Sequence, residues 1–342
     1  MKKLFLMISL LCVIQIPVSI YGSEKTVNIY SARKEELILP LLKIFKKKTG
    51  INYRLITGKA DGLLKRLEIE GKLSPADIFI TVDAGRLQRA KKANILQPVI
   101  SKFLSEKIPE NLRDIDNYWF GLSQRSRTII YNKNKVDKKE LSSYENLAEP
   151  KWNGRLCIRS SSSIYNQSLV ASMIVANGVE RTEMWAEGLV KNFARPPAGG
   201  DTDLLKATAA GQCDIALANT YYLGRLKNSE SEQDRKASEN LIVFWPNQSE
   251  NERGAHVNVS GAGITKYSKN VENAITLLEF LVTNESQKWY AEVNNEYPVV
   301  KGADESDTLK EFGKFRADTL NLSKLGEMNG EAVKLMDRAG WR

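Results

Sequence analysis

Strand-like and helix-like segments alternate twice along this chain. In the first stretch, strands are predicted over residues 27–30, 51–56 and 77–82, with apolar residues at helical spacing between them. The first helix is predicted to begin near Leu39, because the proline that follows it fits the first turn of a helix and disrupts later turns. That start leaves residues 33–36 on a strand-to-helix loop. The order strand, helix, strand, helix, strand predicts an α/β layer.

A second α/β layer is predicted farther along the chain. Its elements are a strand over 155–158, helices over 167–176, 184–192 and 204–210, and a strand over 214–218. In open α/β sheets, ligands bind beyond the carboxyl ends of the strands, where the connecting loops converge. Three segments are expected there, namely residues 30–36, 160–166 and 219–225.

The chain begins like a secreted precursor. Lys2 and Lys3 precede an apolar run over residues 4–18, and small residues follow before the charged part of the chain begins. This pattern predicts a cleavable signal peptide over residues 1–22. The apolar run is shorter than the roughly 20 residues of a membrane-spanning helix, and Cys12 follows a leucine rather than the small residue expected at a lipid attachment site. We therefore expect an exported, soluble protein of about 320 residues, long enough for two lobes.

Positive charge is spread along the chain. The formal net charge of +9 falls to +7 once Lys2 and Lys3 are removed, and the remaining cations are scattered among acids. This spacing is typical of solvated helix faces and disfavours nucleic-acid binding.

Cysteine and histidine are too few for most metal sites. Two cysteines remain after export, Cys157 and Cys213, in a compartment that permits disulfides. They form either one disulfide or two separate buried thiols. Because His256 is the sole histidine, a Cys/His metal cluster is excluded. The sequence also lacks a Gly-x-Ser-x-Gly motif, which disfavours a secreted hydrolase, so we expect a binding protein rather than an enzyme.

Tyrosines gather in the segments expected at the cleft. Tyr221 and Tyr222 follow the strand predicted over 214–218, and adjacent side chains can converge where a strand turns into a helix. Tyr165 lies in the serine-rich run 159–167. A phenol, with a pKa near ~10, binds metal tightly only when a strong Lewis acid such as Fe(III) displaces its proton. Three phenolates would cancel the charge of Fe(III), although tyrosines also pack in cores or line sugar and peptide sites.

Seven segments along nearly the whole mature chain resemble, in the same order, those of periplasmic ferric-ion-binding proteins. They are Tyr30-Ser31-Ala32-Arg33, Ser74-Pro75-Ala76-Asp77-Ile78-Phe79, Gln124-Arg125-Ser126-Arg127-Thr128-Ile129-Ile130-Tyr131, Ser163-Ile164-Tyr165-Asn166-Gln167, Asn219-Thr220-Tyr221-Tyr222, His256-Val257-Asn258-Val259-Ser260-Gly261 and Glu296-Tyr297-Pro298. The resemblance implies an α/β, class II periplasmic binding-protein fold, with two lobes joined by two crossing strands and Fe(III) in the cleft. The first lobe would comprise residues 23–124 and about 255–300, and the second residues 125–254 and about 301–342.

The resemblance also assigns site residues. Tyr165, Tyr221 and Tyr222 match the ligand tyrosines of the family. Arg225 matches a nearby cation that orients or neutralises the site, and Arg125 is assigned a similar part. An ordinary salt bridge is the alternative for both arginines.

The chain departs from the family pattern after its first strand. Many relatives carry His, or His then Tyr, after Tyr-Ser-x-Arg, whereas this chain has Lys34 and Glu35. A charged lysine cannot ligate a metal, so Glu35 is the predicted fourth protein ligand, with waters or a bound anion as the rival. Lys34 and Ser163 are assigned to the surroundings of the metal.

Three further residues are predicted to be structural. Tyr30 is expected to pack at the end of its strand, and Asp83 to cap the helix that follows the third strand. His256 is expected to be hydrogen-bonded on a segment that links the lobes.

The function implied by the resemblance is capture of Fe(III) in the periplasm by a monomer. The protein would deliver the ion to the membrane permease and ATPase subunits of an ABC transporter, since the chain has no phosphate-cradling Gly-x-x-x-x-Gly-Lys-Ser/Thr motif of its own. The alternative is the same fold with a small anion or a polyamine in the cleft.

Overall fold

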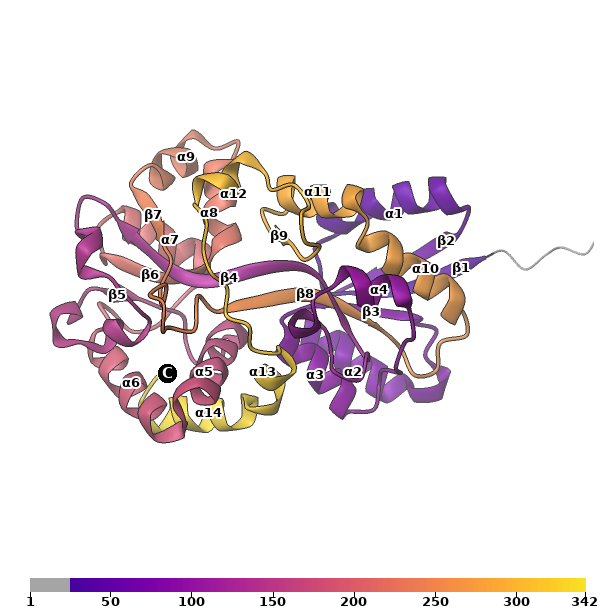
Figure 1. Cartoon of the computed structure of the whole chain (residues 1–342), viewed down its shortest axis with the longest axis horizontal. Coiled ribbons are helices and arrows are strands. Elements are labelled where there is room, and N and C mark those ends of the chain that lie inside the picture. The colour runs from indigo at the N-terminus through magenta and orange to yellow at the C-terminus, as the bar shows by residue number, and fades with distance from the viewer. Residues whose placement is uncertain (1–24) are drawn as a thin grey trace, which may run out of the picture.

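Three parallel strands form the first layer of the computed structural model, which describes residues 25–342 (Figure 1). Its elements are β1 (Thr26–Ser31), α1 (Glu35–Thr49), β2 (Asn52–Thr57), α2 (Ala60–Glu70), β3 (Ile78–Val82) and α3 (Ala84–Lys92). β1 lies between β2 and β3 and pairs with both in parallel. This layer, here the first lobe, follows the predicted order of elements. The predicted signal peptide lies outside the described residues.

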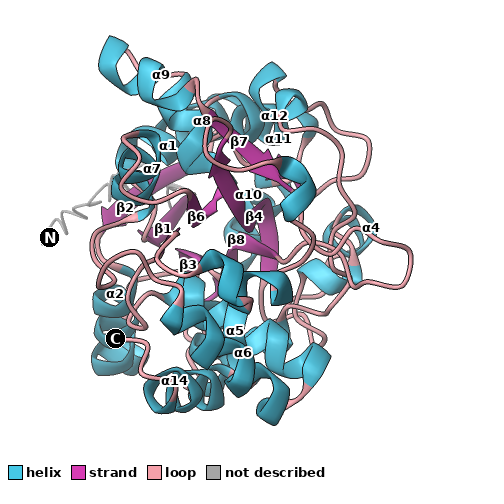
Figure 2. Cartoon of the chain, turned by 90° about the vertical axis from the view of Figure 1, so that its left-hand side faces the viewer, coloured by secondary structure: helices cyan, strands magenta, loops and turns pink. Residues whose placement is uncertain are grey.

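The second lobe repeats this alternation. Its elements are β5 (Leu156–Cys157), α5 (Ile164–Asn177), α6 (Val179–Lys191), α7 (Asp201–Ala209), β6 (Ile215–Asn219), α8 (Thr220–Lys227), α9 (Glu232–Ser238) and β7 (Leu241–Phe244). β5 and β6 pair in parallel. Helices lie on both sides of the strands (Figure 2), and β6 is accordingly buried at every residue.

Two long strands run between the lobes. They are β4 (Phe120–Asn132) and β8 (Val257–Ile264). β8 pairs with β3 of the first lobe and with the beginning of β4, and the remainder of β4 pairs with β6 and β7 of the second lobe. In Figure 1, β4 is the long magenta strand that passes through the middle of the molecule. The two predicted crossing strands are confirmed, whereas the exact lobe boundaries stay a prediction.

The remaining elements cover the lobes and their junction. They are α4 (Lys102–Lys107), α10 (Val271–Leu281), α11 (Asn284–Glu292), β9 (Tyr297–Pro298), α12 (Asp307–Glu311), α13 (Ser323–Glu327) and α14 (Asn329–Arg338). α13 packs against α3 of the first lobe and α5 of the second. The approach is close because Gly326 has no side chain, and a Cβ there would lie 2.3 Å from the Cβ of Gln88. Within residues 25–342, no helix is both long and apolar enough to cross a membrane.

The predicted start of the first helix was wrong. α1 begins at Glu35 rather than near Leu39, so Pro40 lies inside the helix. The proline removes only one backbone hydrogen bond, the one its N–H would have donated to Glu36. Burial of the apolar face formed by Ile38, Leu41, Leu42 and Phe45 offsets that loss.

Two other helix starts bear on the site. α5 begins at Ile164, three residues before the predicted start, and therefore carries Tyr165 in its first turn. α3 is capped as predicted, because the Asp83 carboxylate accepts a hydrogen bond from the Gly85 amide at 2.9 Å.

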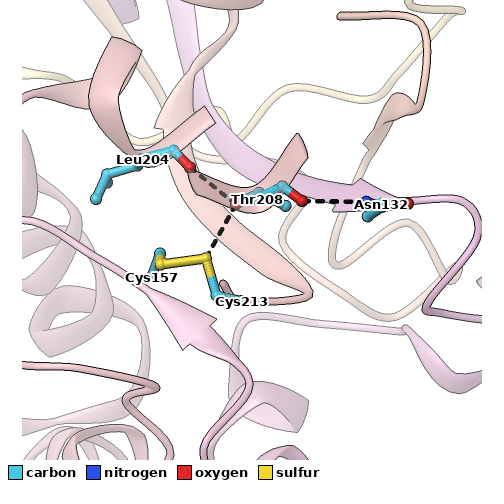
Figure 3. Close-up of a disulfide and its surroundings, with 5 residues drawn as sticks. All are labelled: Asn132, Cys157, Leu204, Thr208 and Cys213. Atoms are coloured by element: carbon cyan, nitrogen blue, oxygen red, sulfur yellow. Dashed lines mark hydrogen bonds between the residues drawn. A yellow bond between two sulfur atoms is a disulfide. The ribbon is translucent and has the colours of Figure 1, made fainter. Parts of the chain in front are cut away.

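Cys157 and Cys213 form one disulfide (Figure 3). Cys157 ends β5 and Cys213 lies two residues before its parallel neighbour β6. The Thr208 hydroxyl of α7 lies 3.2 Å from Cys213 Sγ and donates a hydrogen bond to the Leu204 carbonyl. The bridge thus joins the two strands beneath α7 and resolves the choice that the sequence left open.

Candidate functional site

Two adjacent tyrosines lie side by side just after the end of β6. β6 ends at Asn219 and α8 begins at Thr220, so Tyr221 and Tyr222 lie in the first helical turn. Successive side chains point about 100° apart in a helix instead of to opposite faces. The two ring centroids are accordingly 4.3 Å apart. The predicted convergence of this pair is confirmed.

A third phenol joins the pair from α5. The Tyr221 hydroxyl donates a hydrogen bond to the Tyr165 hydroxyl at 3.2 Å. All three tyrosines line one hollow of about 160 Å³ together with residues of the first lobe. The other lining residues are Ala32, Arg33, Lys34, Leu37, Val82, Arg225 and Glu296. This tyrosine hollow therefore lies between the lobes, where the sequence predicted the site.

Tyr221 and Tyr222 are held in their protonated form. Burial raises the pKa of Tyr221 well above its usual value, and the neighbouring Tyr165 and Tyr222 raise it further, since ionising one phenol opposes ionising the next. Burial and the neighbouring Tyr165 also raise the pKa of Tyr222. Tyr221 and Tyr222 are therefore uncharged at neutral pH, and only a strongly charged cation is able to displace their protons.

Arginines surround the three rings. The Arg225 guanidinium lies 4.8 Å from the ring centroid of Tyr221 and 5.5 Å from that of Tyr222. Arg125 and Arg159 lie 5.8 Å and 5.5 Å from the ring centroid of Tyr165. The charge of Arg125 lowers the pKa of Tyr221 and the charge of Arg159 lowers that of Tyr222, but both effects are smaller than that of burial.

Several buried polar groups near the tyrosines have atoms without a hydrogen-bond partner among residues 25–342, and two of these groups are Arg125 and Ser163. Arg125 is buried, and its Nε and Nη2 atoms make no hydrogen bond, although Nη2 lies 3.9 Å from the Asp83 carboxylate. The Ser163 hydroxyl, at the N-cap of α5, is also buried without a partner. Buried polar groups are normally hydrogen-bonded, so both are available to a bound molecule.

A buried ion pair in the wall of the hollow escaped prediction. Glu296 accepts hydrogen bonds from Arg33 at 3.0 Å and from Ser123. Burial raises the pKa of Glu296, but the positive charges of Arg33 and Arg125 and the hydrogen bond from Ser123 together hold the pKa below its usual value. Both residues occur in the segments that carry the family resemblance, but 263 positions separate them, so sequence reasoning assigned them no role. The negative charge of Glu296 is paired with the positive charge of Arg33. This carboxylate therefore leaves no unpaired negative charge in the hollow.

The first lobe presents Lys34 to the hollow. Lys34 lines it and pairs with Glu36 at 3.3 Å. Glu35 is the exposed first residue of α1 and is not among the lining residues. The structure therefore brings the three tyrosines, Arg225 and Lys34 together in the hollow. It leaves Glu35 outside the lining, at the start of α1.

The remaining predicted residues lie elsewhere. The Tyr30 hydroxyl donates to Glu70 at 2.9 Å, which matches its predicted structural role. His256 is buried directly before β8, and its backbone N–H donates to the Tyr144 hydroxyl at 3.1 Å. In the described part of the chain, no group of three or more His, Cys, Asp or Glu residues is suited to a metal. The tyrosine cluster is thus the candidate metal site.

Known proteins match this chain over nearly its whole length. Residues 41–317 match the family model described as bacterial extracellular solute-binding protein. The iron uptake protein A1 of Synechocystis sp. is 49% identical over 321 residues, which cover 94% of this chain and 89% of that protein.

Solved structures match as well. A Trichodesmium protein (IdiA, FutA) in complex with iron and citrate ligands superposes with a TM-score of 0.90 and 53% identity over 93% of this chain and all of that one. The ferric binding protein of Campylobacter jejuni has a TM-score of 0.87 and 42% identity over 92% of this chain and all of its own. These similarities confirm the predicted two-lobed fold.

Proposed function

The chain belongs to the family of bacterial extracellular solute-binding proteins, and on that premise we propose that it captures Fe(III) through Tyr165, Tyr221 and Tyr222. The observation that supports this most directly is the meeting of three phenols in one hollow between the lobes. Phenolate oxygens are hard, charged donors that suit Fe(III), and three of them neutralise the ion. The ferric or iron-binding names of the similar proteins support the same ligand.

The cations around the hollow disfavour the polyamine alternative. Arg33, Lys34 and Arg225 line it, while its one carboxylate, Glu296, is already paired. The positive charges of the hollow would repel a polyamine. They would not repel a metal ion that is bound by phenolates and by a further anion.

The proposed function also implies a cellular location and protein partners. A member of an extracellular solute-binding family acts outside the cytoplasmic membrane, and we place this one in the periplasm after removal of residues 1–22. It delivers iron to the permease and ATPase subunits of an ABC transporter as a monomer. It catalyses no reaction, since the phenols and arginines of the hollow act by holding the ion.

Iron uptake should release protons. Because the pKa values of Tyr221 and Tyr222 are raised, the phenols are protonated at neutral pH and must lose their protons to ligate. Affinity should therefore rise with pH, by roughly tenfold per pH unit for each proton displaced. We expect Tyr165→Phe to release about one proton fewer per iron than the parent protein.

Calorimetry in two buffers of different ionisation enthalpy measures this release, with Fe(III) supplied as its nitrilotriacetate complex and a protein-free blank. Equal proton release by the parent and by Tyr165→Phe would remove Tyr165 from the metal.

Glu35 remains the proposed fourth protein ligand. Its exposed carboxylate has no hydrogen-bond or ion-pair partner in the described part of the chain, and it follows Lys34, which lines the hollow. Glu35→Gln is expected to weaken iron binding by about tenfold and to leave the tyrosinate colour largely in place, since a carboxylate contributes no phenolate transition.

A competing chelator, used in two buffer anions, measures the affinities. Glu36→Gln is the matched control, because Glu36 is occupied by Lys34. If Glu35→Gln matches the parent and the affinity depends on the buffer anion instead, an anion or water holds that coordination position.

A further inference from the structure

The last part of the chain, residues 321–342, passes from the first lobe to the second. α13 packs against α3 of the first lobe, whereas α14 packs against α5 and α6 of the second. Figure 1 shows α13 beside α3 and α14 below α5. This segment, here called the C-terminal arm, therefore joins the two lobes in addition to β4 and β8.

The beginning of the arm is anchored to the first lobe. The Leu322 N–H donates a hydrogen bond to the Asn111 carbonyl at 2.9 Å. The Ser323 hydroxyl donates to the Asp114 carboxylate at 3.2 Å. That carboxylate is completely buried and also binds Lys91 at 2.9 Å. The arm is thus attached to a fixed charged group of the first lobe.

The start of α14 holds the loop that leads to the tyrosine hollow. The Asn329 side-chain amide donates to Gln167 Oε1 at 3.0 Å, and Gln167 Nε2 donates in turn to the Ser161 carbonyl at 2.9 Å. Ser161 belongs to the loop 159–163, which is followed directly by α5 with Tyr165 in its first turn.

The residues after α14 hold the same loop at a second point. Trp341 is completely buried, and its ring meets those of Trp185 and Phe193 at centroid distances of 6.3 Å and 5.7 Å. Its indole N–H donates to the Arg159 carbonyl at 2.9 Å. The same carbonyl accepts a hydrogen bond from Asn166 of α5 at 2.8 Å. The arm and the first turn of α5 therefore meet at one atom of the loop.

We propose that the C-terminal arm is a positioning element of the iron site, which fixes the loop 159–163, and with it Tyr165, relative to the first lobe. The inference rests on the proposed function and extends it. Groups that orient a metal ligand typically change the affinity for the metal by 10–100-fold when they are lost. Because the arm acts one step farther from the metal, a smaller loss is expected.

Trp341→Phe tests the end of the arm, because it keeps an aromatic ring and removes the hydrogen bond to Arg159. Fe(III) binding, measured against a competing chelator, should weaken by roughly five- to tenfold. The visible band should also shift, because the Tyr165 phenolate would sit differently on the metal.

Trp152→Phe is the matched control. Trp152 is equally buried, and its indole N–H donates to Asn146 Oδ1 at 3.2 Å instead of to the loop. Both substitutions should lower the urea unfolding midpoint, but Trp152→Phe should leave the iron affinity and the visible band as they are in the parent.

Repeating the substitution in the Tyr165→Phe protein separates positioning from general destabilisation. If the arm acts through Tyr165, Trp341→Phe should cost little further affinity once the Tyr165 hydroxyl is gone.

Gly326→Ala tests the beginning of the arm. A Cβ there would lie 2.3 Å from the Cβ of Gln88, so the arm has to move away from α3. This variant should lose iron affinity as Trp341→Phe does, and it carries the test if Trp341→Phe does not fold. Gly330→Ala is its control, because a Cβ at Gly330 meets no atom within 4 Å. It should bind iron as the parent does.

Iron affinities and visible bands equal to those of the parent in both Trp341→Phe and Gly326→Ala would overturn the proposal. Equal losses in Trp341→Phe and Trp152→Phe, or an undiminished loss in the Tyr165→Phe background, would also overturn it, since the arm would then only stabilise the fold. Failure of the proposed function shows separately, as a parent protein that takes up no Fe(III).

Discussion

Replacing Tyr221 or Tyr222 with phenylalanine is expected to weaken Fe(III) binding by more than about 100-fold, since changes to groups that only support a metal ligand already cost 10–100-fold. Each substitution removes one anionic oxygen from a trication and leaves an apolar ring edge in its place. Ferric phenolate absorbs visible light by charge transfer, so much of the colour should be lost as well.

The fold should survive both substitutions. Phenylalanine keeps the ring, and the contact between the two rings at 4.3 Å involves no hydroxyl. Thermal unfolding of the metal-free proteins checks this point. Tyr267→Phe is the control, because Tyr267 is partly exposed and does not line the tyrosine hollow. Unchanged affinity and an unchanged visible band in both Tyr221→Phe and Tyr222→Phe would contradict the phenolate assignment.

Asp201→Ala is expected to lower the free energy of unfolding by about 3–5 kcal/mol, the usual cost of leaving one partner of a buried ion pair uncompensated. Asp201 and Arg127 are fully buried, and their charged groups are 3.0 Å apart. Arg127 also donates to Asn166 Oδ1 and to the Leu217 carbonyl, both at 2.9 Å, so it connects β4 with α5 and β6.

The same carboxylate supports the site. Asp201 accepts a hydrogen bond at 3.0 Å from the backbone N–H of Asn219, which lies two residues before Tyr221. Urea unfolding of the metal-free protein measures the loss. Glu232→Ala, which breaks an exposed pair with Lys236, should leave the unfolding midpoint nearly unchanged. A midpoint in Asp201→Ala equal to that of the parent would show that the pair contributes no net stability.

Local patterns predicted the features that depend on neighbouring residues. The alternation of strands and helices follows from hydrophobic periodicity, and the convergence of Tyr221 and Tyr222 follows from a strand that turns into a helix. The predicted start of α1 was wrong because it depends on contacts with residues that are distant in the sequence. Pro40 argued locally against a longer helix, and only burial of the apolar face against the rest of the lobe makes the longer helix favourable.

Features that join distant residues were beyond prediction from one sequence. Arg33 and Glu296 meet because the loop after β1 and the residue before β9 come together in the fold, and no periodic pattern links them. The disulfide became definite only once β5 and β6 were placed side by side.

The central claim is that Tyr165, Tyr221 and Tyr222 hold one Fe(III) per chain, and a ferric titration followed by visible absorption and metal analysis tests it most directly. The predicted result is a charge-transfer band that saturates at one iron per chain, disappears when a strong chelator removes the metal, and returns on reloading. A protein that stays colourless and retains no stoichiometric iron would contradict the claim.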